Sequence, residues 1–233
     1  GEIDNGQNTN IINGDRANNL TLGGNLNNGN DLVVRNNGRG DMLVNGTIDN
    51  ENNAELSNAG KEMTLSGKLV NGRDLSVLNN GSGVQTISGT IENGNTAELT
   101  NNGTSMVVSG DVTNGGNMTV TNNGQGGMTL SADSSLDNGG LLYVTNNAGD
   151  MNMSGAVTNR GILTRIFNRG TDANVNGRID NAKDLVVLND GNGALNVGAT
   201  VVNGNDAEIT NNGTYANVSG NITNGNNIVI TNN

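Results

Sequence analysis

Apolar and polar residues alternate along this chain with a period of two. Between residues 63 and 79, for example, the apolar set includes Met63, Leu65, Leu69 and Leu75, and most of the residues between them are polar. A period of two predicts β-strands, because successive side chains of a strand point to opposite faces of a sheet. The pattern therefore predicts an all-β structure made of short strands.

The strands recur in a tandem repeat. The motif SGTIENG at 88–94 aligns with ten further copies, and the Asn near the end of each copy returns after 21 to 24 residues. Each unit of about 22 residues indicates three short strands separated by corners that carry SG, NG or NNG. The sequence thus predicts one continuous solenoid over residues 1–233, a single-stranded parallel β-helix of about 10 to 11 coils. We expect Gly and Asn to supply positive-φ conformations at its corners.

Asparagine also returns at two positions of every unit, in phase with the apolar residues. If these positions face inward, each amide lies about 4.8 Å from its counterpart in the next coil and hydrogen-bonds to it. The alternative is that these asparagines are turn formers that face water. The first predicted ladder comprises Asn5, Asn28, Asn50, Asn71, Asn93, Asn114, Asn138, Asn159, Asn181, Asn203 and Asn224. The second comprises Asn13, Asn36, Asn58, Asn79, Asn101, Asn122, Asn146, Asn168, Asn189, Asn211 and Asn232.

Composition agrees with a thin, stacked core. The 233 residues include 51 Asn and 37 Gly but only three aromatic residues, too few for a conventional thick core. Cysteine and histidine are absent, which excludes disulfides, thiolate or imidazole metal sites and His-dependent catalytic triads from this chain. We therefore expect no cofactor.

The charge balance and the termini narrow the partners. A formal charge of −11 disfavours nucleic acid, because phosphate binding needs a cationic surface. No apolar stretch approaches the roughly 18 residues that span a bilayer, so we expect no membrane insertion. The repeat starts and stops without a capping element, which suggests a segment of a longer repeat protein.

The chain resembles the stalks of filamentous-haemagglutinin-type exoproteins of bacterial two-partner secretion systems. The shared features are tandem coils with Asn-Gly corners, as in LSGKLVNGRDLSVLNNG at 65–81, few aromatic residues, no cysteine and an acidic pI. The resemblance extends over all 233 residues and lies in the general repeat pattern, not in a diagnostic motif. It implies a right-handed β-helix, export through an outer-membrane transporter, and a location outside the cell or on the bacterial surface. It further implies a fibre engaged in adhesion, aggregation or biofilm formation.

Two local features are candidate contact sites. Arg39, Gly40 and Asp41 form an RGD tripeptide at a corner, where a receptor on a host surface would meet it; a solvated turn is the alternative. In the least regular coil, Arg165, Phe167 and Arg169, with Tyr143 one coil earlier, form a basic patch with outward rings. Such a patch would dock an acidic polymer or a like copy, or is a decayed repeat.

These observations favour a non-enzymatic structural stalk. The first alternative is a module whose faces bind a glycan or another surface, and the second is a β-helical enzyme that processes polysaccharides. The enzyme is disfavoured because no insertion exceeds about three residues and no outlying acid pair marks a cleft. The stalk would then contact like copies of itself or neighbouring coils of one long chain. A part of the protein that the stalk carries would bind a host-surface or glycan receptor.

Overall fold

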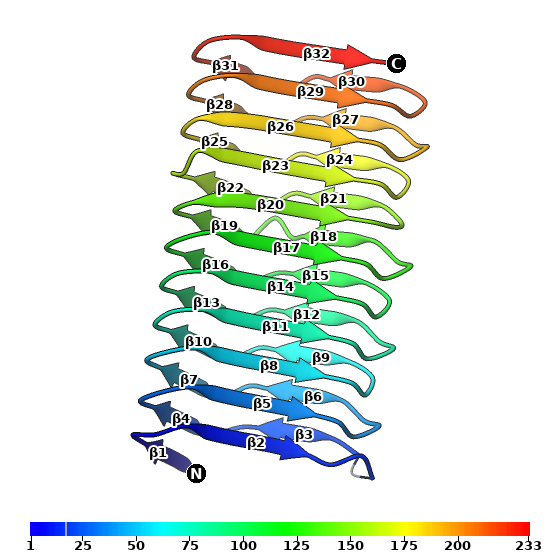
Figure 1. The fold of residues 1–233 in the computed structure, drawn as a ribbon. Helices are drawn as coiled ribbons and strands as arrows, with labels where there is room; N and C mark the ends of the chain where they lie inside the picture. Colours follow the sequence, from blue (N-terminus) through cyan, green and yellow to red (C-terminus); the bar gives the residue numbers. More distant parts are fainter. Residues whose placement is uncertain (17) are drawn as a thin grey trace.

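Each turn of the chain forms three strands, one in each of three parallel sheets that run the length of the molecule (Figure 1). The computed structural model describes residues 1–16 and 18–233. In these residues the three sheets have 11, 11 and 10 strands, and successive coils pair in parallel. The predicted all-β parallel solenoid is therefore confirmed.

The first sheet contains β1 (Glu2–Asn5), β4 (Asn25–Asn28), β7 (Thr47–Asn50), β10 (Lys68–Asn71), β13 (Thr90–Asn93), β16 (Asp111–Asn114), β19 (Ser135–Asn138), β22 (Ala156–Asn159), β25 (Ile179–Asn181), β28 (Val201–Asn203) and β31 (Ile222–Asn224). The second contains β2 (Thr9–Asn13), β5 (Leu32–Asn36), β8 (Ala54–Asn58), β11 (Leu75–Asn79), β14 (Ala97–Asn101), β17 (Met118–Asn122), β20 (Leu141–Asn146), β23 (Leu163–Asn168), β26 (Asp184–Asn189), β29 (Ala207–Asn211) and β32 (Ile228–Asn232). The third contains β3 (Leu20–Leu22), β6 (Met42–Val44), β9 (Met63–Leu65), β12 (Gln85–Ile87), β15 (Met106–Val108), β18 (Met128–Leu130), β21 (Met151–Met153), β24 (Ala173–Val175), β27 (Leu195–Val197) and β30 (Ala216–Val218).

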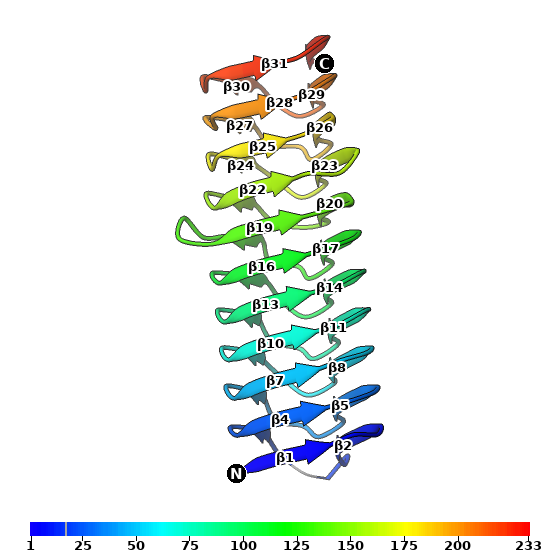
Figure 2. The same ribbon diagram turned by 90° about the vertical axis from the view of Figure 1, so that its left-hand side faces the viewer.

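The coil is right-handed. In Figure 1 the second sheet runs from left to right at the front and the third sheet returns behind it while the chain rises from the N-terminus. In Figure 2 the first sheet brings the chain back toward that front face. Right-handed crossovers are the rule for parallel strands in one sheet, because strand twist favours them.

Corners absorb the differences in repeat length, so the strands stay in register. Asn101 pairs with Asn79 in the preceding coil and with Asn122 in the next. The coil between Asn114 and Asn138 has two or three extra residues, and they enlarge the corner between β18 and β19, which projects in Figure 2. Register is conserved because a slip of one residue would turn every buried side chain outward.

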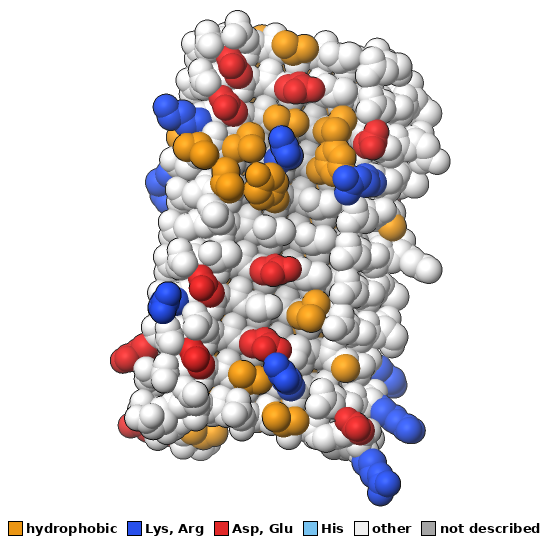
Figure 3. Space-filling view, in the orientation of Figure 1, with side chains coloured by type: hydrophobic (Ala, Val, Ile, Leu, Met, Phe, Trp, Pro, Cys, Tyr) orange, Lys and Arg blue, Asp and Glu red, His pale blue; other side chains and the backbone are white. Residues whose placement is uncertain are grey.

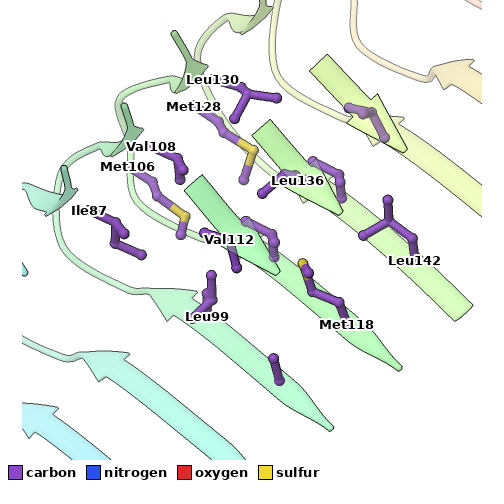
Figure 4. Packing of buried hydrophobic residues seen from close by; sticks show 14 of the residues in the cluster. Ile87, Leu99, Met106, Val108, Val112, Met118, Met128, Leu130, Leu136 and Leu142 are labelled. Atoms are coloured by element: carbon purple, nitrogen blue, oxygen red, sulfur yellow. The ribbon is translucent and has the colours of Figure 1, made fainter. Parts of the chain in front are cut away.

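The core is a set of apolar columns, each built from one residue per coil (Figure 4). In the third sheet one column stacks Met42, Met63, Gln85, Met106 and Met128, all essentially inaccessible to solvent. Unbranched methionine side chains fill such a column without fixed shape. Gln85 has a similar length, but its Oε1 atom has no hydrogen-bond partner in the described residues.

The expected role of positive φ at the corners is wrong. Among the described residues no non-glycine residue has positive φ, and Gly149 is the one glycine that does, at 62°. Glycine is required instead by the close approach of stacked corners. A Cβ atom on Gly89 would lie 1.8 Å from the carbonyl oxygen of Gly67, and one on Gly110 would lie 1.9 Å from that of Gly89.

Candidate functional site

The second asparagine ladder is continuous from Asn13 to Asn232. In each of its ten successive pairs, Nδ2 donates to Oδ1 of the next coil over 2.7 to 2.9 Å. Corner backbone groups supply further bonds: Asn36, for example, donates to the Gly40 carbonyl and accepts from the Gly38 N–H. The members from Asn36 to Asn211 are buried, so the prediction of inward ladders is confirmed and the interpretation as solvated turns is wrong.

The first ladder is confirmed from Asn28 to Asn224, with bonds of 2.6 to 3.3 Å, but not at Asn5. Asn5 donates to the Thr9 hydroxyl, which in turn donates to Asn28 Oδ1, each over 2.7 Å. Thr164 occupies the same position in its own coil and donates to Asn181 Oδ1. The Asn159–Asn181 bond, which uses the same oxygen, is the longest bond of the first ladder, at 3.3 Å. A hydroxyl at this otherwise apolar position reaches the ladder across the corner and competes for its oxygen.

A third row of asparagines lies on the surface beside the second ladder, and the sequence analysis missed it. Asn102 donates to Asn80 and accepts from Asn123, which accepts in turn from Asn147. Arg169 extends the row by donating from Nη1 to Asn147 Oδ1 over 2.9 Å. The signal was the second Asn of each NN pair, which reads as an ordinary turn residue.

Two columns of outward residues cover the face of the second sheet, which faces the viewer in Figure 3. One runs through Val33, Glu55, Ser76, Glu98, Thr119, Tyr143, Arg165, Val186, Glu208 and Val229. The other runs through Arg35, Ser57, Leu78, Thr100, Thr121, Thr145, Phe167, Leu188, Thr210 and Thr231. Their irregularity excludes the uniform threonine array that ice binding would need.

Hydrophobic side chains gather over β20, β23 and β26 on this face (Figure 3). We call Tyr143, Phe167, Val186 and Leu188, together with Arg165 and Arg169, the aromatic patch; they line one shallow groove, to which Thr145 and Glu208 also contribute. The guanidinium carbon of Arg169 lies 4.1 Å from the centre of the Phe167 ring, and that of Arg165 lies 5.8 Å from the Tyr143 ring. The structure thus brings all four predicted contact residues of this region together.

The same face carries an acidic groove nearer the N-terminus, lined by Asp31, Glu55, Asp74 and Glu98. Arg35 donates to both carboxylate oxygens of Glu55, over 2.9 and 3.0 Å, and this contact raises the pKa of the Arg35 guanidinium. Glu98 makes no ion pair in residues 1–16 and 18–233. Carboxylates also line the groove next to the aromatic patch, where Asp184, Asp206 and Glu208 lie near Arg165. Both ends of the face therefore carry acidic side chains, and the aromatic patch adds two arginines and two rings to one of them.

The RGD tripeptide is built into the stack of corners. Arg39 is exposed, whereas Gly40 and Asp41 are half-buried. The Gly40 N–H donates to the Asn18 carbonyl, and Asp41 Oδ1 accepts from the Glu62 N–H over 3.2 Å. The Asp41 carboxylate is therefore engaged in a hydrogen bond to the next coil, and of the three residues only Arg39 is fully exposed.

The described residues contain no group of three or more Asp or Glu side chains placed to hold a metal ion, and no helix that is long and apolar enough to cross a membrane. No protein-family model, curated protein or solved structure matches this chain.

Proposed function

We propose that this chain is a structural stalk: a rigid rod within a secreted or cell-surface bacterial protein that spans distance and supports adhesion, aggregation or biofilm formation. The observation that carries the proposal is the unbroken second ladder, whose ten direct bonds link successive coils. Such a lattice resists bending, because a tilt of one coil would strain a buried hydrogen bond in each neighbour. At about 4.8 Å per coil, the rod is about 50 Å long.

Stacking with a fixed rise makes length a simple function of coil number. The resemblance to two-partner exoproteins supports export through an outer-membrane transporter and a location on the cell surface. A part of the protein that the stalk carries would then bind the host-surface or glycan receptor. Catalysis is no part of the proposal.

The experiment is to change length without changing surface chemistry. Deleting residues 66–108 joins Leu65 to Ser109 and removes two coils in register, because Ser66 and Ser109 are equivalent. We expect the variant to fold and its maximum dimension in small-angle scattering to fall by about 10 Å. In cells that display the protein, a stalk predicts that adhesion falls with the deletion and is unchanged by outward substitutions such as Thr119→Ser. The proposal would be overturned if the two-coil deletion left adhesion unchanged and an outward substitution abolished it.

The second candidate function is glycan binding, and the outward rings of the aromatic patch favour it. Aromatic rings provide flat apolar surface, and Arg165 and Arg169 would pair with acidic sugars. A glycan array separates the two functions: retention of an acidic glycan that is lost in Phe167→Ser supports the binding module, and no retention leaves the stalk.

A further inference from the structure

Exposed Asn-Gly pairs recur at the corners that follow the second sheet, where each asparagine lies next to a member of the second ladder. The pairs are Asn37-Gly38, Asn80-Gly81, Asn102-Gly103, Asn123-Gly124 and Asn212-Gly213. An asparagine is chemically least durable before glycine, because glycine has no side chain to shield its backbone nitrogen from the preceding amide. These corners are therefore places where the chain can be modified without an enzyme.

The reaction at such a pair is deamidation. The glycine backbone nitrogen loses its proton to water or hydroxide and attacks Cγ of the preceding asparagine. A bond forms between this nitrogen and Cγ, the Cγ–Nδ2 bond breaks, and Nδ2 takes up a proton and leaves as ammonia. Water then opens the resulting cyclic imide at either carbonyl, which gives aspartate or isoaspartate. Water is the only co-reactant.

The second ladder holds the glycine nitrogen in some of these pairs and not in others. The N–H groups that donate to the Oδ1 atom of the ladder asparagine two residues earlier, over 3.1 to 3.2 Å, are those of Gly38, Gly81 and Gly103. The N–H groups of Gly124 and Gly213 make no hydrogen bond within residues 1–16 and 18–233. A nitrogen that must first break a hydrogen bond reacts more slowly, because the cost of that bond adds to the barrier.

Asn102 and Asn123 form a matched pair. Both are exposed, both lie in an Asn-Asn-Gly sequence, and each donates to the preceding member of the surface row and accepts from the next. They differ in the N–H of the following glycine, which is bonded to the ladder only after Asn102. We propose that Asn123 is a site of spontaneous deamidation and is modified before Asn102. Asn192 and Asn212, which are exposed and precede a glycine N–H with no hydrogen bond in the described chain, are further sites.

The buried first ladder protects the same dipeptide. In six of its buried members Nδ2 donates both to the next ladder asparagine and to a corner carbonyl. The N–H of the glycine that follows each of them donates to the backbone carbonyl of the preceding ladder member over 2.8 to 2.9 Å. These six are Asn28, Asn71, Asn93, Asn114, Asn138 and Asn203. Deamidation there requires local unfolding, which breaks all of these bonds.

Deamidation at Asn123 would alter one corner of the stack. The product carboxylate cannot donate to Asn102 Oδ1, as Asn123 Nδ2 does over 2.8 Å, and it places negative charge beside that oxygen. Isoaspartate also lengthens the backbone by a methylene group, where a Cβ atom on Gly124 would already lie 2.2 Å from the Gly103 carbonyl oxygen. We therefore expect the modification to loosen the corner between β17 and β18. The inference does not rest on the stalk function.

Incubation of the intact, folded chain in mildly alkaline buffer tests the proposal. Peptides are released at acid pH, where the reaction is slow, and mass spectrometry follows deamidation at each asparagine over time. We expect Asn123 to react about tenfold faster than Asn102, the rate equivalent of one hydrogen bond of about 1.4 kcal/mol. In concentrated urea, where these bonds are lost, the two rates should converge. Equal rates in the folded chain, or a difference that persists in urea, would overturn the inference.

Two ladder variants test the role of the glycine N–H directly. Asn101→Leu removes the acceptor of the Gly103 N–H, and Asn79→Leu removes the equivalent acceptor one coil earlier. We expect Asn101→Leu to accelerate deamidation at Asn102 more than at Asn80, and Asn79→Leu to do the reverse. Both variants lose ladder bonds, so general loosening of the corner would accelerate both sites alike, and that result would overturn the inference. The wild-type comparison stands without either variant.

Discussion

Two rows of asparagines lie side by side at one corner and differ mainly in their contact with water. Asn79, Asn101 and Asn122 form bonds of 2.7 and 2.8 Å and are fully buried. Their neighbours Asn80, Asn102 and Asn123 form bonds of 2.6 and 2.8 Å and are exposed. The bonds in the two rows are nearly the same length, so bond geometry alone would predict equal contributions to stability.

The difference in burial makes one row structural and the other dispensable. A buried amide that loses its partner has no water to replace it and retains the full desolvation cost, about 1 to 3 kcal/mol. An exposed amide exchanges one hydrogen bond for another with solvent. We therefore expect stability to follow burial within a single tripeptide, Asn101-Asn102-Gly103.

Gly103→Ala should have the largest effect. An added Cβ atom would lie 2.0 Å from the Gly83 carbonyl oxygen and 2.8 Å from Asn79 Nδ2, so backbone in two coils must move. We expect a loss of about 3 kcal/mol or more in the free energy of unfolding, measured by urea denaturation. Gly6→Ala is the control, because no atom lies within 4 Å of its added Cβ, and it should change stability by less than about 1 kcal/mol. Equal losses would contradict the steric explanation.

Asn101→Leu should come next, with a loss of about 1 to 3 kcal/mol. It removes the acceptor of Asn79 Nδ2 and of the Gly103 N–H, and the donor to Asn122 Oδ1. Amide hydrogen exchange at Gly103 should accelerate with the loss of stability measured in urea. Unchanged stability would mean that the ladder contributes nothing beyond packing.

Gln85→Met should have a smaller effect of opposite sign. Gln85 is a buried amide like Asn101, but its Oε1 atom is unpaired and its Nε2 atom faces only the Met63 sulfur at 3.9 Å. Methionine restores the column and removes the unpaired oxygen, so we expect a gain of about 1 to 2 kcal/mol in urea denaturation. A destabilised variant would show that Gln85 is satisfied in solution.

Asn102→Ser should have the smallest effect, less than about 0.5 kcal/mol, because water replaces its bonds to Asn80 and Asn123. The same denaturation series measures it. A loss equal to that of Asn101→Leu would show that burial does not separate the two rows.

Much of the fold could be predicted because the repeat is strict. The period of two placed Leu99 and Asn101 inward, and the 22-residue period placed each beside its equivalent in the next coil. The aromatic patch was also accessible, since Phe167 and Tyr143 occupy outward positions of neighbouring coils. The role assigned to the corner glycines was wrong, because positive φ and close approach select the same residue type.

The sequence by itself determined the coil, its register and both ladders, since each depends on a local period that every unit repeats. Only the tertiary structure decided how the Thr9 and Thr164 hydroxyls enter the first ladder, why Asp41 is held within the corner stack and how far stacked glycines exclude a Cβ atom. It also decided that acidic and cationic groups share one face. These features depend on distances of a few ångströms between residues about 20 positions apart, and a period fixes which residues are neighbours but not how closely their atoms meet.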